Sequence, residues 1–186
     1  EFYFWKNQTG ENDLILLSGD SQAQTIEGQY EVANCILDFA TKMGAKLLIT
    51  VGGFRKETEK TPRVIAVSTS PELLKKALEA QATSSPPGNP IVGTAGLLLG
   101  LARFWNIDAL CLLGETRGYL PDPKAAKSIL EVLQRMLNIQ FDKSGIDAEI
   151  EKAKKIAARM REIEEKRESY AREMRRTEEE RITYIS

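Results

Sequence analysis

The sequence predicts a three-layer α/β/α domain with a mostly parallel sheet, followed by a long charged helix. Three observations support this fold class. Short apolar segments of strand length are almost continuous rather than alternating, which is typical of strands covered on both faces. Amphipathic helical patterns alternate with these segments. The last forty residues are dense in charge and, from Ile146 to Arg181, contain neither proline nor glycine.

The strands of the predicted sheet are rich in leucine and β-branched residues. Four buried strands are expected at residues 13–18 (DLILLS), 46–51 (KLLITV), 63–68 (RVIAVS) and 108–113 (DALCLL). Residues 2–5 (FYFW) add an edge or antiparallel strand, and we expect further residues before Glu1. Gly52 and Gly53 are expected to end the second strand, with a solvated loop after them.

The helices are marked by their apolar spacing and by their first residues. Residues 26–43 carry an apolar face and end before Gly44, a typical helix stop. Ser70-Pro71 and Asp122-Pro123 each combine a capping side chain with proline at the first helical position. Residues 95–105 are apolar nearly all round and predict a buried helix. Residues 83–90 have the composition of a surface loop.

The C-terminal region predicts one extended helix at residues 146–181, after a linker at 142–145 and a domain at 1–141. Eleven acidic and eleven basic residues lie between Asp147 and Arg181, many of them three or four apart. A narrow apolar stripe for docking on the domain or on another copy begins at Ile146 and fades toward the end. Residues 182–186, ITYIS, form a short and mostly apolar tail. We expect its residues Ile182, Tyr184, Ile185 and Ser186 to enter a pocket of a partner protein.

Composition narrows the function classes. The formal net charge of −1 gives no general attraction to nucleic acid or to anionic membranes, and no apolar run is long enough to span a bilayer. Cys35 and Cys111 lie in apolar patterns and are expected to be isolated buried thiols rather than a disulfide or a reactive pair. A reducing, cytoplasmic location fits this expectation.

The sequence carries no recognisable catalytic motif. It contains no histidine, no Cys-x-x-Cys, no P-loop and no Gly-x-Gly-x-x-Gly, so we expect no metal or cofactor. Gly93 and Gly96 could present backbone N–H groups to an anion, although close helix–sheet packing at Gly93, Gly96 and Gly100 is the preferred interpretation. A polar pocket could form at the end of a strand; its candidate residues are Glu115, Thr116, Arg117, Tyr119 and Asp122.

Two segments carry a family resemblance. Residues 88–100 (GNPIVGTAGLLLG) and 112–126 (LLGETRGYLPDPKAA), together with Gln29-Tyr30 and Gly52-Gly53-Phe54, resemble the archaeal and eukaryotic proteasome assembly chaperone family. The resemblance implies a fold related to nucleoside phosphorylases without their catalytic groups. It also implies binding to α subunits of the proteasome core particle through a C-terminal tail. In the family that tail ends in a hydrophobic residue, tyrosine and one last residue, whereas here Tyr184 is followed by two residues.

The resulting hypothesis is a non-enzymatic, homo-oligomeric assembly chaperone or activator, with four or five copies and partners that include neither nucleic acid nor membrane. Two alternatives stay open at this stage. One is an oligomeric scaffold or adaptor for another protein. The other is a small-molecule, nucleoside-type enzyme using the acidic and basic residues near Glu115.

Overall fold

The computed structural model describes residues 1–8, 12–56, 61–86, 88, 90–118, 120–140 and 142–183, without the side chains of 161, 164 and 171–183. The chain divides into two compact units, Glu1–Asp142 and Lys143–Ser186. In the described residues, no helix is both long and apolar enough to cross a membrane.

The first unit contains a four-stranded mixed sheet, and its strand order is β3-β6-β4-β5. The bounds are Leu47–Arg55 for β3, Asp108–Thr116 for β6, Val64–Ser68 for β4 and Thr83–Ser84 for β5. Strand β6 runs parallel to β3 and antiparallel to β4, while β4 and β5 are parallel. The central position of β6 explains its continuous apolar sequence, because seven of its nine residues are buried.

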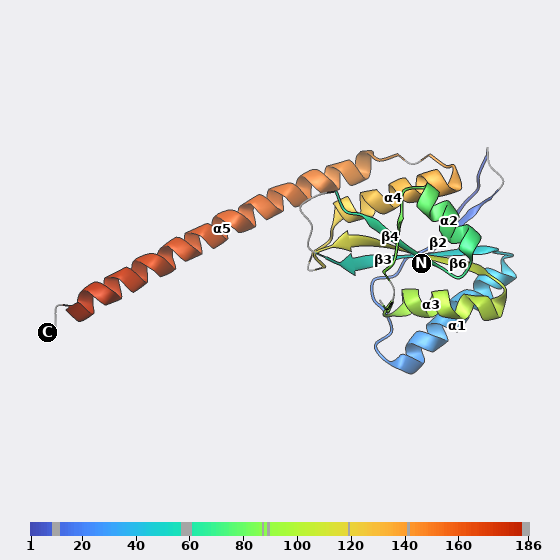
Figure 1. Cartoon of the computed structure of the whole chain (residues 1–186), viewed down its shortest axis with the longest axis horizontal. Coiled ribbons are helices and arrows are strands. Elements are labelled where there is room, and N and C mark those ends of the chain that lie inside the picture. The colour runs from blue at the N-terminus through green and yellow to red at the C-terminus, as the bar shows by residue number, and fades with distance from the viewer. Residues whose placement is uncertain are drawn as a thin grey trace. The chain divides into compact units, whose positions relative to one another are not determined.

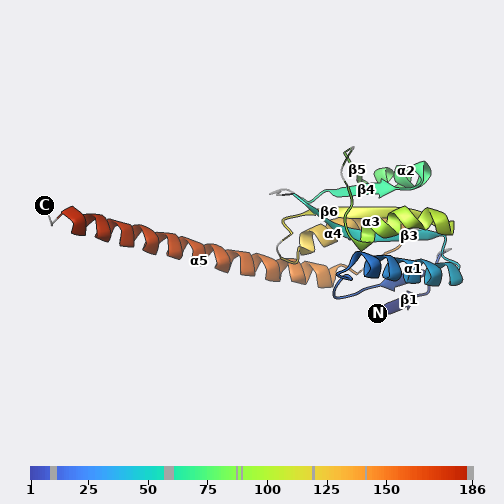
Figure 2. The ribbon, with the colours of Figure 1, turned by 90° about the horizontal axis from the view of Figure 1, so that it is seen from below.

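Two pairs of helices cover the two faces of this sheet, as Figures 1 and 2 show. Helices α1 (Ile26–Lys42) and α3 (Thr94–Ala102, followed by a 3-10 turn at Arg103–Trp105) pack on one face, against Ala109, Cys111 and Leu113. Helices α2 (Pro71–Glu79) and α4 (Pro123–Leu137) pack on the other, against Leu110 and Leu112. Alternate residues of β6 therefore belong to two separate cores, and the predicted α/β/α fold is confirmed.

The predicted helix starts are confirmed in detail. The Ser70 hydroxyl accepts a hydrogen bond from the backbone N–H of Leu73, and Pro71 opens α2. The Asp122 carboxylate accepts from the N–H groups of Lys124 and Ala125, both at 3.1 Å, at the start of α4. These bonds satisfy N–H groups that have no partner within the helix. Gly44, at φ 76°, follows α1 as expected.

Strands β1 (Phe2–Trp5) and β2 (Leu14–Leu17) form a separate antiparallel sheet, not part of the main one. The expectation that residues 13–18 form a buried strand was wrong, since Leu16 and Leu17 are about half exposed. Phe2 and Phe4 of this small sheet contact Phe39 of α1, with ring centroids 4.5 and 6.5 Å apart. An apolar run indicates that a strand tends to be buried, but it does not show which other strand it pairs with.

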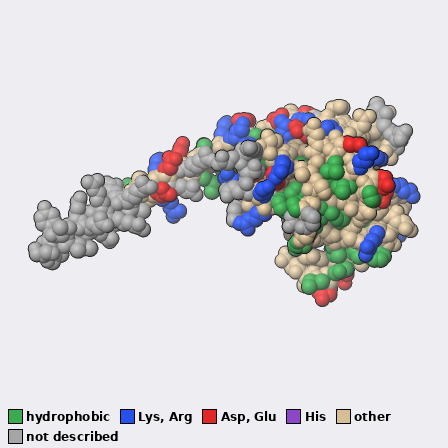
Figure 3. All heavy atoms as spheres, viewed as in Figure 1, with side chains coloured by type: hydrophobic (Ala, Val, Ile, Leu, Met, Phe, Trp, Pro, Cys, Tyr) green, Lys and Arg blue, Asp and Glu red, His purple; other side chains and the backbone are tan. Residues whose placement is uncertain are grey.

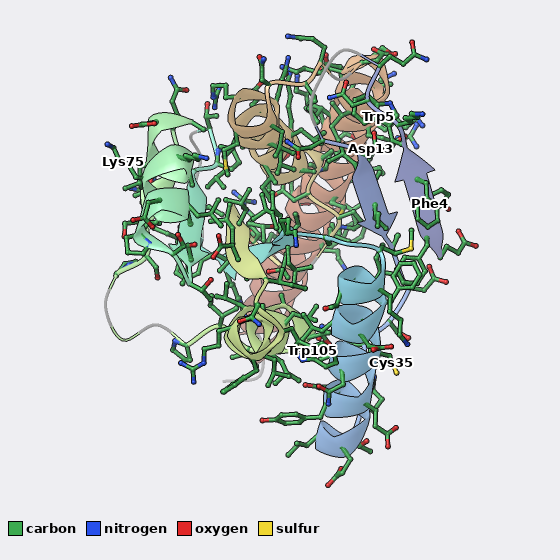
Figure 4. The ribbon with its side chains drawn as sticks, turned by 90° about the vertical axis from the view of Figure 1, so that its right-hand side faces the viewer. Phe4, Trp5, Asp13, Cys35, Lys75 and Trp105 are labelled. Carbon is green, nitrogen blue, oxygen red and sulfur yellow. The ribbon has the colours of Figure 1, made fainter. Side chains whose placement is uncertain are left out.

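Two other expectations need correction. Gly52 and Gly53 do not end the second strand: β3 continues through them to Arg55, in register with Leu113 and Gly114 of β6. A Cβ atom on Gly53 would lie 2.9 Å from a Thr116 methyl group, so close packing between strands favours glycine there. Cys35 is exposed, whereas Cys111 is buried. Figure 4 shows Cys35 on the side of α1 turned away from Trp105.

The second unit consists of helix α5, which extends from Ser144 to Thr183. Its 40 residues correspond to about 60 Å of helix. Residues 144 and 145, expected in the linker, belong to its first turn, where the Asp147 N–H donates to the carbonyl of Lys143 at 3.0 Å. Ion pairs within the helix join Glu149 to Lys152 and Glu151 to Lys154, each at 2.6 Å.

Candidate functional site

The best-defined polar cluster of the described residues surrounds Glu115, near the end of β6. The side chain of Glu115 is 3% exposed. Its Oε1 atom accepts from Nε and Nη2 of Arg63, at 3.1 and 2.9 Å, and lies 3.3 Å from Nζ of Lys56. Its Oε2 atom accepts from the backbone N–H of Arg63 at 3.1 Å. Because both cationic side chains are about half exposed, the cluster has a buried anion beneath a positively charged surface.

Strand pairing brings these three residues together. Phe54 of β3 is opposite Glu115, and the next residues along, Arg55 and Thr116, are also paired. The Lys56 N–H then donates to the Thr116 carbonyl at 2.9 Å. On the other side, the Glu115 N–H donates to the carbonyl of Arg63, which immediately precedes β4. The Glu115 carboxylate thus ties the end of β3 and the start of β4 to the central strand.

The electrostatics of the cluster keep Glu115 ionised. Burial by itself raises the pKa of this carboxyl, but hydrogen bonds from the Arg63 side chain, the Arg63 backbone and Lys56 outweigh burial and hold the pKa below its ordinary value. A carboxylate held in this way is neither a proton donor nor a good base at neutral pH. The arrangement therefore favours a structural role, and it gives no support to the nucleoside-type enzyme.

The other residues expected around Glu115 have separate roles. Thr116 accepts a hydrogen bond from the Gly118 N–H at 3.2 Å and so shapes the turn after β6. Asp122 caps α4, and its carboxylate is not bonded to Glu115. Arg117 is exposed beside this turn, and Tyr119 lies outside the described residues. Glu115 and Asp122 are not the pair of loop acids that the sequence suggested, because β6 extends three residues further than predicted.

Sequence reasoning missed Arg63 and Lys56 as partners of Glu115. Arg63 directly precedes a buried strand, but Glu115 lies 52 residues away near the end of another strand, and the sequence does not show that these two strands are neighbours. Lys56 stood in a segment rich in both charges and carried no distinguishing signal. Among the described residues, no group of three or more aspartate, glutamate or cysteine side chains is placed to hold a metal ion.

The start of α3, the other candidate for anion binding, is occupied by a side chain of the same chain. Gln22 Oε1 accepts from the backbone N–H of Thr94 at 3.0 Å and from its hydroxyl at 3.2 Å. A Cβ atom on Gly96 would lie 2.2 Å from the Ile91 carbonyl oxygen, so glycine is favoured there by close packing against the loop before α3 rather than against the sheet. A Cβ atom on Gly100 would meet nothing within 4 Å, so close packing does not account for the glycine at that position.

Two shallow hollows of about 430 and 440 Å³ lie at the opposite end of β3 and β6 from Glu115. They share Thr69 and Arg103. One is lined further by α3, and the other by Lys46 and Asp108, which precede or begin the two strands. The first is also lined by Gly96, one of the two glycines considered for anion binding, and neither is lined by a residue of the candidate pocket around Glu115.

Most of the predicted tail lies outside the described residues. Ile182 belongs by its backbone to the last turn of α5, and Tyr184, Ile185 and Ser186 lie outside the described residues. Its role as a contact site stays a prediction.

The chain is similar to several known proteins. The model of the PAC2 family matches residues 1–164. The uncharacterized protein MJ1210 of Methanocaldococcus jannaschii is 38% identical over 156 residues, which are 79% of this chain and 60% of that protein. This chain spans 53% of a second protein of that organism, MJ0106.

Two solved structures from Pyrococcus furiosus are similar. PbaB, described as an archaeal proteasome activator, is 33% identical with a TM-score of 0.79, over 86% of this chain and 70% of that one. PbaA, described as an archaeal homolog of proteasome-assembly chaperone, is 28% identical with a TM-score of 0.72, over 95% and 71%. The resemblance to the proteasome assembly chaperone family is confirmed.

Proposed function

Because the chain belongs to the PAC2 family, we propose that it is a non-enzymatic proteasome assembly chaperone or activator. Its partners are the α subunits of the proteasome and further copies of itself, in a complex of four or five. It acts in the cytoplasm. The similarity to PbaB and PbaA supports the proteasome as the partner.

The observation that carries the tail contact is the length of α5. One helix, described without a break from Ser144 to Thr183, leads directly to Tyr184. A helix holds its end at a fixed distance from its start, so Ile182 and Tyr184 can be presented to a pocket about 60 Å from Ser144. Several copies in one complex raise the effective concentration of the tails, so that individually weak contacts suffice.

The test is binding of the full chain to archaeal proteasome α subunits, measured by pull-down and by NMR titration. Burying one large apolar side chain contributes about 1.5–3 kcal/mol. Deleting residues 182–186, or combining Ile182→Ala with Tyr184→Ala, should therefore weaken binding at least about tenfold. Thr177→Ala, on the same helix but outside the tail, serves as the matched control and should bind as the unchanged chain does. Equal binding with and without residues 182–186 would remove the tail from the proposal.

A further inference from the structure

Helix α5 carries a row of large apolar side chains that the described chain leaves exposed. Ile156, Met160, Ile163 and Tyr170 are 55, 48, 57 and 71% exposed. Steps of four, three and seven residues keep all four within an arc of roughly 80° around a helix of 3.6 residues per turn. Figure 3 shows hydrophobic side chains among charged ones on the described part of this helix. We call these four residues the α5 seam.

The spacing of the seam is that of a coiled coil. With Met160 at the first position of a heptad, Ile156, Ile163 and Tyr170 occupy the fourth positions, so both core positions of the repeat are represented. Arg167 occupies the first position of the following heptad and interrupts the apolar row. A row that follows the 3.5-residue repeat fits another helix lying nearly parallel to α5.

From this geometry we propose that the occupant of the α5 seam is α5 of a second copy, running in the same direction. The charges beside the seam select this orientation. Along the seam, as far as Tyr170, the residues immediately before the first heptad positions are Lys152, Arg159 and Lys166, all basic. In an antiparallel pair these residues face their own counterparts, and like charges repel. In a parallel pair they face the fifth heptad positions of the partner helix, Ala157, Glu164 and Ala171, so none of them meets a like charge and Arg159 meets an acidic residue. The helix as a whole adds no repulsion, because its acidic and basic residues balance.

Arg167 has a defined role in such a pair. A charged side chain at a single core position weakens a coiled coil and favours one register over the alternatives. The pairing is therefore weaker than an uninterrupted seam would give, and Arg167→Leu should strengthen it.

A parallel pair brings two tails to the same end of the assembly. This consequence rests on the proposed function, since it matters only if residues 182–186 contact the proteasome. The pairing of α5 itself needs no proteasome and is measured without it. Failure of tail binding and failure of α5 pairing can therefore be told apart.

The test is disulfide cross-linking of the full chain at single introduced cysteines. Cys35 is first replaced by serine, because it is exposed and would form unrelated cross-links. Met160→Cys and Arg167→Cys are then made separately. Both positions should cross-link to themselves in another copy under mild oxidation. An antiparallel pair, which has one crossing point, would allow this at only one of them.

Two double variants link the cross-link to the seam. Ile156→Glu with Ile163→Glu places two charges in it, and the cross-linked fraction at Met160→Cys should fall at least tenfold. Ala158→Glu with Ser169→Glu adds the same charge on the opposite face, and the fraction should stay within twofold. Circular dichroism of each variant establishes that the helix is intact. Arg167→Leu should lower the protein concentration at which half of the Met160→Cys chains cross-link.

Two results would overturn the proposal. One is that neither Met160→Cys nor Arg167→Cys forms a cross-link in the full chain. This is the result expected if the seam packs on its own domain or on a different protein. The other is a cross-link at Met160→Cys that the charged seam variant leaves unchanged.

Discussion

Replacing Glu115 by glutamine changes the charge of one buried side chain with little change in its shape. The carboxylate accepts three hydrogen bonds from Arg63 and forms an ion pair with Lys56. A hydrogen bond to a charged group contributes about 1.5–3 kcal/mol. Water can solvate the freed cations, because the side chains of Arg63 and Lys56 are 58 and 47% exposed. We therefore expect Glu115→Gln to lower the free energy of unfolding by about 2–3 kcal/mol, less than the sum of its contacts.

The assay is urea and thermal unfolding of the full chain at neutral pH. A loss of this size corresponds to roughly 5–10 °C in the melting temperature. The matched control is Glu79→Gln, which removes an exposed carboxylate 4.0 Å from Lys75 and should barely change stability. Equal effects of the two substitutions would refute the assignment of Glu115 as the tie between three strands.

The same variant has a distinct pH dependence. The pKa of Glu115 is lower in the folded protein than the value of about 4.3 expected in the unfolded chain. Its ionised form therefore contributes stability that is fully present above the unfolded pKa and is lost as the pH falls through the folded pKa. The stability difference between the unchanged protein and Glu115→Gln should be constant above about pH 5 and shrink below pH 4. A difference that is the same at pH 3 and pH 7 would contradict this reasoning.

Two further predictions concern packing and accessibility. Gly96→Ala should destabilise the protein by about 1–3 kcal/mol, because its Cβ atom would lie 2.2 Å from the Ile91 carbonyl oxygen. Gly100→Ala should raise the free energy of unfolding by roughly 0.5–1 kcal/mol, because its Cβ atom would meet nothing within 4 Å and alanine is favoured over glycine inside a helix. Thermal melts of both variants check this, and shifts of the same sign would contradict it. With a thiol reagent, Cys35 should react in the native state and Cys111 only after unfolding, because burial excludes the reagent from Cys111 and raises the pKa of its thiol. Two fast-reacting thiols per native chain would refute that account.

The sequence was most informative where local chemistry decides the structure. The starts of α2 and α4 at Ser70-Pro71 and Asp122-Pro123 depend on a side chain two or three residues from the N–H groups that it caps, so they could be predicted. The two buried faces of β6 could be predicted as well, because a central strand needs apolar residues on both sides.

The expectations that failed depend on contacts distant in sequence. Whether Cys35 is buried depends on which face of α1 is turned toward the sheet. On that helix only Ala33 and Leu37 are fully buried, so the covered face is narrow. The cluster at Glu115 requires residues 52 and 59 positions away along the chain. No periodicity contains that information, because it arises from strand order and register rather than from local spacing.

The order of the strands also means that, during synthesis, the sheet lacks its central strand until β6 has been made. Strand β6 is the partner of both β3 and β4, yet it is the last of the sheet to be synthesised. About 60 residues separate the end of β3 from the end of β6, which corresponds to roughly 3–12 s of translation. During that interval β3 has no partner strand in the sheet and β4 has only the two-residue β5. Until β6 is made, the backbone N–H and C=O groups of β3 and β4 that pair with it are therefore unpaired, and such strand edges can associate with other chains.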